Sequence, residues 1–331
     1  MSVPVPDGQP EASTTGSIPG QDAECQVLPQ EAGWRLDHFL SARFPEHSRS
    51  FFLKLAQQAR VSVNGRPAAK AGLRLKTGDR VAFAAPAAEP SALRPEPIAF
   101  EVLFEDEDLL LLSKPPGLTV HPGSGQKSGT LANGLLYRYA TLPGLAEGRA
   151  GLVHRLDKDT SGLLLVARNE RCLQALMAAF QERSVRKVYH AILLRSPAEA
   201  QGRITAPIGR HPLQRQKMAV REQNGRFAAT NWRVVERFAN GWVLAEIGLE
   251  TGRTHQIRVH MSALHCPVAG DTLYGGRVAA SAPVRPLRQM LHASSLTFTH
   301  PVSGQEMTAT APFWPDMQAV LAALRGLGRA P

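Results

Sequence analysis

The chain has 331 residues, of which 43% are hydrophobic and 20% are charged, and its formal net charge is +10. This length is sufficient for two domains, and this composition is typical of a globular protein rather than a disordered or membrane chain. Residues 1–31 hold five acidic residues and no lysine or arginine, so the rest of the chain carries about +15. An acidic segment before a strongly basic body favours a polyanionic partner, most simply a nucleic acid, although basic proteins without such a partner also exist.

The cysteines and the apolar segments indicate the compartment. Cys25, Cys172 and Cys266 are far apart and form no CxxC pair, which is typical of a reducing environment. No apolar segment follows a basic start, and no apolar run has the length of a membrane span. We therefore expect a cytoplasmic protein with no membrane partner.

The N-terminal quarter predicts a tail followed by a small domain. Residues 1–33 are rich in Pro, Gly, Ser, Thr and acids without a hydrophobic period, which predicts a disordered acidic tail. Residues 34–83 predict two amphipathic helices and then strands at 61–63 and 81–83. Ten lysines and arginines face three acidic residues in this domain. The module resembles the S4 RNA-binding domain, and the alternative is a small basic domain with a packing role only.

A linker separates this module from a larger domain. Residues 84–97 contain four prolines and five alanines and predict an extended linker. In residues 98–325 the predicted elements are strands at 98–104, 109–113, 152–155, 163–167 and 186–194, helices that begin after Thr130, after Asn169 and at Pro315, and a hairpin over 296–312. Strands dominate, so the predicted fold class is α+β, with a mostly antiparallel or mixed sheet and flanking helices.

The stretch GLVHRLDKDTSGLLLVAR, residues 151–168, places a polar segment between two of these strands. A turn there requires only Asp-Thr-Ser-Gly, so the preceding His-Arg-Leu-Asp is more than a turn needs. Asp157 can be a turn residue or a catalytic carboxylate. Asp159 is a competing carboxylate that the spacing does not exclude.

Other kinds of site are disfavoured. Ser161 lacks the flanking glycines of a hydrolase nucleophile elbow. His255, His260 and His265 are five residues apart, which on a helix turns successive side chains through ~140°, away from a shared ion. No Gly-rich phosphate-binding motif follows a predicted strand. We therefore expect no metal and no nucleotide cofactor.

Three further stretches accompany HRLDKDTSG, namely KPPGLTVHPGSG (114–125), RKVYHAIL (186–193) and LETGRTHQIRVHM (249–261). In this order and at these separations the set resembles the pseudouridine synthases of the large-subunit rRNA family, over essentially residues 34–325. The resemblance implies an isomerase that breaks the bond between uracil N1 and ribose C1′, turns the base and rejoins it through C5 without a cofactor.

The resemblance also implies roles for individual residues. Asp157 is the catalytic carboxylate, and Arg258 is the arginine that pairs with it, since a buried carboxylate needs a neighbouring cation to stay ionised. Tyr189 stacks on the uracil near C5, and Arg155 inserts into the RNA where the flipped uridine was. Strand alternation puts Lys187 on the face of Tyr189, toward RNA. The alternatives are an Asx-turn role for Asp159 and ordinary helix or strand roles for the others.

Further RNA contacts are expected between residues 202 and 226, where basic residues face a single acid, Glu222. We interpret this stretch as a phosphate-binding insertion that includes Arg210, Arg215 and Lys217; the alternative is a solvated basic loop. The implied partner is large-subunit ribosomal RNA or a pre-ribosomal particle, bound by a monomer through exposed single-stranded uridines.

Two other functions fit parts of the pattern. The first is a ribosome-assembly factor that binds RNA without catalysis, which would not require Asp157, Tyr189 and Arg258 together. The second is a nucleoside hydrolase, which would need a second carboxylate as general acid at ~5 Å, and only Asp159 is an obvious candidate.

Overall fold

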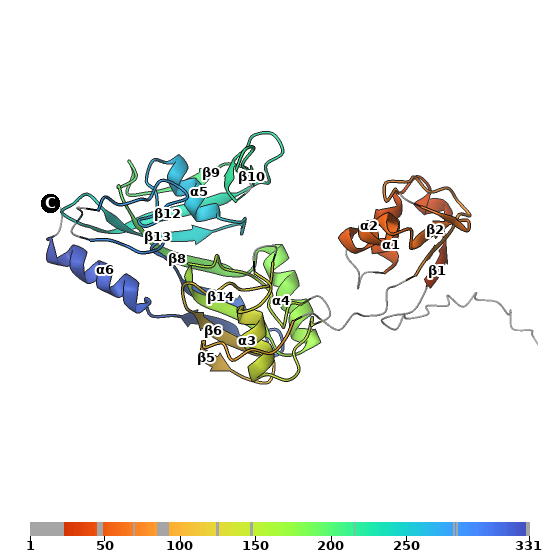
Figure 1. The fold of residues 1–331 in the computed structure, drawn as a ribbon, viewed down its shortest axis with the longest axis horizontal. Helices are drawn as coiled ribbons and strands as arrows, with labels where there is room; N and C mark the ends of the chain where they lie inside the picture. The colour runs from red at the N-terminus through yellow and green to blue at the C-terminus, as the bar shows by residue number, and fades with distance from the viewer. Residues whose placement is uncertain are drawn as a thin grey trace, which may run out of the picture. The chain divides into compact units, whose positions relative to one another are not determined.

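The computed structural model describes residues 23–44, 49–68, 70–84, 93–123, 126–145, 148–214, 216–280, 282 and 284–328. The chain divides into two compact units, Met1–Pro90 and Ser91–Pro331 (Figure 1). Among the described residues, no helix combines the length and the apolar character that a membrane crossing needs.

The first unit packs two helices on a four-stranded sheet. Its elements are β1 (Ala23–Gln26), the short 3-10 helix η1 (Pro29–Glu31), α1 (Leu36–Arg43), α2 (Arg49–Gln57), β2 (Val61–Val63), β3 (Arg66–Pro67) and β4 (Arg80–Phe83). The sheet order is β1-β4-β2-β3. The predicted apolar stripe of α1 is buried, with Leu36, Phe39 and Leu40 at most 1% exposed. The two helices and the later strands agree with the sequence-based prediction.

The predicted disorder of the tail is wrong for residues 23–33. β1 pairs antiparallel with β4, and Val27 is only 1% exposed. Glu31 accepts hydrogen bonds from Arg43 at 2.9 and 3.0 Å. A free edge of β4 and a buried place for Val27 outweigh the polar composition of the segment. The remainder of the predicted tail, residues 1–22, lies outside the described residues.

The predicted linker also ends earlier than expected. Leu93 is buried in the core of the second unit. The Arg94 carbonyl accepts from the Asn133 side chain at 2.8 Å, and the Glu96 carboxylate accepts from the Gly129 N–H at 2.9 Å. Residues 93–97 are therefore part of the second unit, because residues 129–133 supply partners for a Pro-rich segment that has little periodicity of its own. Residues 85–92 lie outside the described residues.

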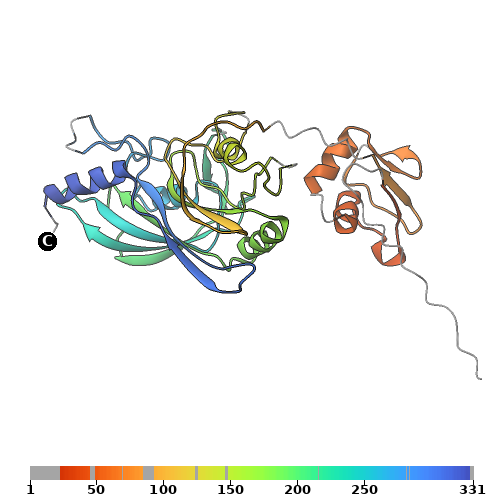
Figure 2. The ribbon, with the colours of Figure 1, turned by 90° about the horizontal axis from the view of Figure 1, so that it is seen from below.

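A nine-stranded sheet forms the second unit, in the order β5-β6-β7-β14-β8-β13-β12-β9, with β15 also beside β14. The strands are β5 (Glu101–Glu105), β6 (Leu109–Lys114), β7 (Ser161–Ala167), β8 (Arg186–Leu193), β9 (Gln201–Thr205), β12 (Ala229–Arg237), β13 (Val243–Leu249), β14 (Leu291–Thr299) and β15 (Glu306–Thr310). Only the β7–β14 pair is parallel among these strands, which confirms the mixed, mostly antiparallel sheet. Figure 2 shows its marked curvature.

Helices cover both faces of this sheet. They are α3 (Leu131–Arg138), α4 (Glu170–Glu182), α5 (Gln256–Ala263) and α6 (Pro315–Gly326). Leu110 and Leu112 pack with α3 and α5 on one face, whereas Leu109 and Leu111 pack with α4 on the other. α6 packs on the second face against β8 and β13.

The strand predicted at 152–155 is not formed. Only Leu152 bridges to β7, opposite Val166, and the chain then leaves the strand geometry. The reason is a side chain: His154 Nε2 accepts the Leu165 N–H at 2.9 Å. That N–H would otherwise bond to a carbonyl of a neighbouring strand. Residues 153–160 therefore form a loop, whose backbone conformation is not set by pairing with a neighbouring strand.

Candidate active site

The loop from 151 to 160 begins against the end of β7. Gly151 has φ +74°, and a Cβ there would lie 2.1 Å from the Ala167 carbonyl oxygen. Ala167 N–H donates to the Gly151 carbonyl at 2.8 Å. Only glycine permits this close approach, so Gly151 determines where the loop leaves the sheet.

Alternate side chains of the loop point inward. His154 is stacked on Phe180 with ring centroids 4.6 Å apart, and burial lowers its pKa to about 3. Leu156 is 4% exposed in the core. With these two residues packed inside, Arg155 is exposed and Asp157 lines a pocket of about 90 Å³. The crowded motif therefore combines anchors with residues that face solvent and the pocket.

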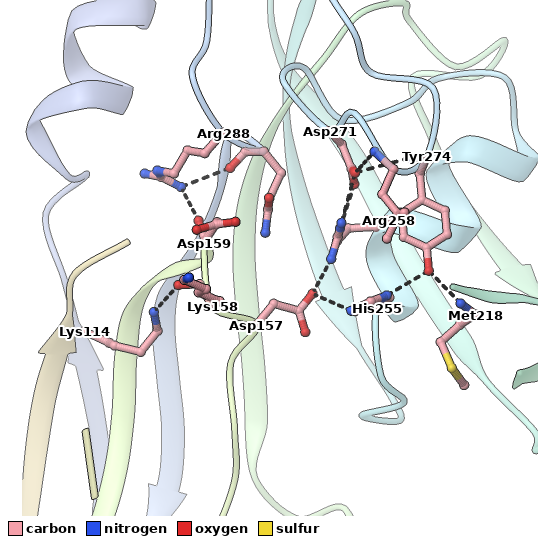
Figure 3. A network of polar contacts seen from close by, with 12 residues as sticks. Lys114, Asp157, Lys158, Asp159, Met218, His255, Arg258, Asp271, Tyr274 and Arg288 are labelled. Atoms are coloured by element: carbon pink, nitrogen blue, oxygen red, sulfur yellow. Dashed lines mark hydrogen bonds and ion pairs between the residues drawn. The ribbon is translucent and has the colours of Figure 1, made fainter. Parts of the chain in front are cut away.

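Two buried cations hold the second half of the loop (Figure 3). The Lys114 ammonium donates to the carbonyls of Pro115, Leu118 and Lys158 at 2.7–2.9 Å. The Arg288 guanidinium donates to the Asp159 carbonyl at 2.9 Å and pairs with Asp316 on α6. These two residues were not predicted from the sequence. Lys114 begins the KPPGLTVHPGSG motif, but nothing in the pattern of residues indicated that one of its partners is a backbone carbonyl 44 residues away.

Asp157 and Arg258 meet as predicted. Arg258 Nη1 donates to Asp157 Oδ2 at 2.9 Å, although the two residues are 101 positions apart. The same guanidinium binds Asp271 through Nε at 2.6 Å and Nη2 at 3.0 Å. Burial alone would lower the pKa of Arg258, but the two carboxylates outweigh it and raise that pKa. Arg258 is therefore a permanent cation that holds the carboxylate of Asp157 in place.

The described contacts of the Asp157 carboxylate are all at one oxygen. Arg258 and the more distant His255 Nε2, at 3.9 Å, both lie near Oδ2. Among the described residues, no hydrogen bond to Oδ1 is present. The side chain is 17% exposed, and it faces the pocket. An oriented carboxylate with one free oxygen can act as a nucleophile or as a base.

Tyr189 lies on β8 and lines the same pocket. Its side chain belongs to the core and the residue is 8% exposed. Burial, followed by the charge of Asp157, raises its pKa, so the phenol keeps its proton at neutral pH. Leu249 and Leu291 also line the pocket, which gives it apolar surface beside the carboxylate. A planar base bound in this pocket would lie beside both the Tyr189 ring and the Asp157 carboxylate.

The other predicted RNA contacts have different surroundings. Lys187 does share the buried face of β8 with Tyr189, but its ammonium donates to the Val185 carbonyl at 3.1 Å and lies over Phe180. This arrangement gives Lys187 a packing role in the structure. Arg210 and Lys217 lie on a hairpin, β10 (Ile208–Arg210) and β11 (Met218–Val220), rather than on an unstructured loop. Arg215 lies outside the described residues.

The spacing of His255, His260 and His265 argued against a shared ion, and the first two have different hydrogen-bond partners. His255 Nδ1 is 2.7 Å from the Tyr274 hydroxyl, and His260 bonds to Thr230 and the Ala206 carbonyl. Asp271 and Tyr274, both near Asp157, were missed as individual residues. Their stretch GDTLYGG, 270–276, is a recognisable motif, but only the fold shows that it meets α5.

Within the described residues, one group has metal-ligand geometry, formed by Asp106, Asp108 and His300. His300 Nδ1 accepts the N–H groups of Val302 and Ser303, so Nε2 carries the proton and donates it to Asp106 at 3.0 Å. A protonated nitrogen has no lone pair for an ion. The hydrogen bonds of this group therefore stabilise the turn between β5 and β6.

Comparisons with known proteins agree with this geometry. The model of the RNA pseudouridylate synthase family matches residues 108–263, and that of the S4 domain matches residues 34–81. A Xanthomonas campestris protein named ribosomal large subunit pseudouridine synthase D is 43% identical over 309 residues, which cover 90% of this chain and 92% of the relative. The Escherichia coli K12 protein of the same name is 39% identical over 308 residues, with 90% and 93% covered.

A solved structure gives the same result. The human protein titled RNA pseudouridylate synthase domain containing 4 superposes with a TM-score of 0.56 at 26% identity, covering 68% of this chain and 93% of that one. The extent of these matches confirms the predicted resemblance. The chain belongs to the RNA pseudouridylate synthase family and is an isomerase with an N-terminal S4 domain.

Proposed function

We propose that this enzyme converts uridines of large-subunit ribosomal RNA to pseudouridine with Asp157 as its catalytic carboxylate. The observation that carries the proposal is the single-sided pairing of Asp157 with Arg258 at 2.9 Å, at the wall of a pocket that also holds Tyr189. The rRNA substrate is supported by the names of the relatives, which match this chain along 90% of its length.

The reaction is balanced without an added reactant. The N1–C1′ bond breaks, a C5–C1′ bond forms, the proton on C5 leaves and N1 gains a proton. Asp157 either attacks C1′ or removes a proton from C2′, and its free Oδ1 is suited to both. Arg258 binds and orients the carboxylate, and Tyr189 stacks on the detached uracil. Arg155, exposed beside the pocket, fills the position that the flipped uridine vacates.

RNA binding involves both units. The S4 domain supplies phosphate contacts through its excess of basic residues. Further contacts come from Arg210 and Lys217 on the β10–β11 hairpin, and from Arg215. We place the enzyme in the cytoplasm, as a monomer on free rRNA or on a pre-ribosomal particle. A role in binding alone is not favoured, because binding would not require a buried arginine between two carboxylates.

The test is a map of pseudouridines in large-subunit rRNA from cells that lack this protein. We expect specific sites to disappear, to return with the wild-type chain and to stay absent with Asp157→Asn expressed at the same level. An unchanged map in the deletion strain would overturn the proposed substrate. Restoration by Asp157→Asn would overturn the assignment of the carboxylate and favour a binding role.

A further inference from the structure

The Tyr274 hydroxyl lies between the β10–β11 hairpin and the catalytic carboxylate (Figure 3). It accepts the backbone N–H of Met218, the first residue of β11, at 2.7 Å. On its other side it is 2.7 Å from His255 Nδ1. His255 Nε2 in turn is 3.9 Å from Asp157 Oδ2. Two hydrogen bonds and one longer contact, which exceeds hydrogen-bond distance, therefore connect the hairpin with Asp157.

The chemistry of the groups sets the direction of this path. A phenol has one proton, and the Met218 N–H occupies a lone pair of its oxygen. In the direction that the inference uses, the phenol donates its proton to His255 Nδ1, and the neutral imidazole carries its proton on Nε2. The Nε2–H group then points a donor toward the oxygen of Asp157 that Arg258 already binds. Hydrogen bonding fixes the tautomer in this way.

The charges around His255 are compatible with a neutral ring. Burial lowers its pKa, and Arg258 and Arg155 act in the same direction. Asp157 and Asp271 act in the opposite direction and are weaker than burial. A neutral His255 gives Asp157 a dipole rather than a full charge, so the carboxylate keeps more of its reactivity than it would beside an imidazolium.

Two other features hold this arrangement in place. His255 has φ +57°, a left-handed conformation that is uncommon for a non-glycine residue, at the N-cap of α5. Such strain persists where the surroundings require it, and it is found at functional sites. The Tyr274 ring packs against the Arg258 guanidinium, with 4.9 Å from Cζ to the ring centroid. One phenol therefore contacts both groups that face Asp157.

We infer that Tyr274 is a positioning residue for Asp157, acting through His255, and that it couples the seating of RNA on the hairpin to the catalytic carboxylate. The inference rests on the proposed role of Asp157. Arg210 and Lys217 flank the linkage, since Arg210 is opposite Met218 in the hairpin and Lys217 precedes it. RNA phosphates held by these two residues would fix β11, and hence the Met218 N–H that orients the phenol.

The first experiment replaces Tyr274 by Phe, which keeps the ring and removes the hydroxyl. The readout is the single-turnover release of tritium from uridine C5 in a large-subunit rRNA transcript, with RNA affinity measured in parallel. We expect the rate constant to fall about tenfold to a hundredfold while the dissociation constant stays within about twofold. Tyr139→Phe is the matched control, because it removes a hydroxyl that contacts only the exposed Glu105 side chain among the described residues.

A pH profile separates this role from simple packing. Without the phenol proton on Nδ1, the neutral ring loses its stabilisation, so the pKa of His255 rises. The acid limb of the Tyr274→Phe profile should therefore move to higher pH, by about one unit. This shift should vanish in the double variant Tyr274→Phe with His255→Gln, which has no imidazole to protonate.

A second pair of variants is independent of how Tyr274→Phe folds. His255→Gln places an amide N–H near the position of Nε2, whereas His255→Asn places one near Nδ1. We expect Gln to turn over about tenfold faster than Asn, with equal RNA binding. Equal rates for the pair, or a Tyr274→Phe enzyme whose rate and pH profile match Tyr139→Phe, would overturn the inference. Normal turnover by Asp157→Asn would instead overturn the proposed function itself.

Discussion

A triad of charged side chains lies in each unit of this protein, and these two triads are opposite in composition. In the S4 domain one carboxylate, Asp37, lies between Arg35 and Arg49. In the synthase domain one guanidinium, Arg258, lies between Asp157 and Asp271. The arginines of the first triad are half exposed, at 50% and 54%, whereas Arg258 is 8% exposed.

The two triads also differ in how many acceptor sites are occupied. Asp37 uses both oxygens, accepting from Arg35, Arg49 and the His38 N–H. Asp271 likewise uses both oxygens, for Arg258 and for the N–H groups of Leu273 and Tyr274. Asp157 uses one. A carboxylate whose two oxygens are both bound supports structure, and one that keeps a free oxygen beside a pocket is available for chemistry.

The largest expected effect tests this distinction directly. Asp157→Asn keeps the size and polarity of the side chain but removes its charge, so single-turnover pseudouridine formation should fall by at least about a thousandfold. RNA binding should persist or tighten, because the variant has no negative charge near the phosphates.

Asp159→Asn is the matched control for that variant, since its loop contact with Arg288 is made by the backbone carbonyl. It should change stability more than rate. An inactive Asp159→Asn enzyme beside a normal Asp157→Asn enzyme would reverse the assignment of the nucleophile.

Arg258→Lys should have the next largest effect. Lysine keeps the charge but cannot bind Asp271 bidentately and reach Asp157 at the same time. We expect the single-turnover rate to fall by about a hundredfold, with folding largely kept. Arg325→Lys is the control, because Arg325 also contacts a carboxylate bidentately, that of Glu236, yet its side chain is 52% exposed. Equal kinetics for the two variants would show that burial of Arg258 is irrelevant.

Removal of the S4 domain should change binding without abolishing chemistry. A chain that begins at Ser91 keeps the interactions of Leu93, Arg94 and Glu96 with the synthase domain, and it should turn over bound RNA at close to the normal rate. Its affinity should be lower, and the slope of log Kd against log salt should flatten by about 0.7–0.9 for each phosphate that the S4 domain no longer neutralises. An unchanged slope would argue against an RNA-binding role for the domain.

A chain that begins at Ile98 sharpens this prediction. It lacks the buried Leu93 and the Glu96 carboxylate that accepts from Gly129. It should therefore melt at a lower temperature than the chain from Ser91, although both lack the same S4 domain. Identical melting curves for the two chains would show that residues 93–97 belong to the linker, as the composition predicted.

The smallest expected effect is on stability and concerns the triad of the S4 domain, Arg35, Asp37 and Arg49. Burial alone would raise the pKa of Asp37, but hydrogen bonds from Arg35 and Arg49 outweigh it and lower that pKa. The carboxylate therefore stabilises the folded domain above its unfolded pKa of about 3.9, and this stability is lost as the pH falls through the lower folded pKa. Asp37→Asn should cost about 0.5–1 kcal/mol near neutral pH, and much less in acid. Hydrogen exchange of the α1 amides in the full chain measures both values.

Much of this protein was determined by local sequence. Two apolar stripes with a 3.6-residue period identify helices, whatever packs against them. One is formed by Leu36, Phe39 and Leu40, and the other by the four buried residues of α6. The short continuous apolar runs of β6 and β7 are also local signals, and they indicate buried strands. The specific motif pair around Asp157 and Arg258 identified the family, the reaction class and the main residues.

Tertiary structure alone decided how the site is held. The sequence suggested a strand at 152–155, but His154 takes the Leu165 N–H and makes it a loop. Lys114 and Arg288 support that loop through backbone carbonyls, which carry no side-chain signature in a sequence.

The same limit applies to Tyr274, since its partner at Met218 is a backbone N–H 56 residues away. Side-chain periodicity is a local property that can be read from the sequence. Contacts between a buried polar group and a distant backbone group exist only after the chain has folded.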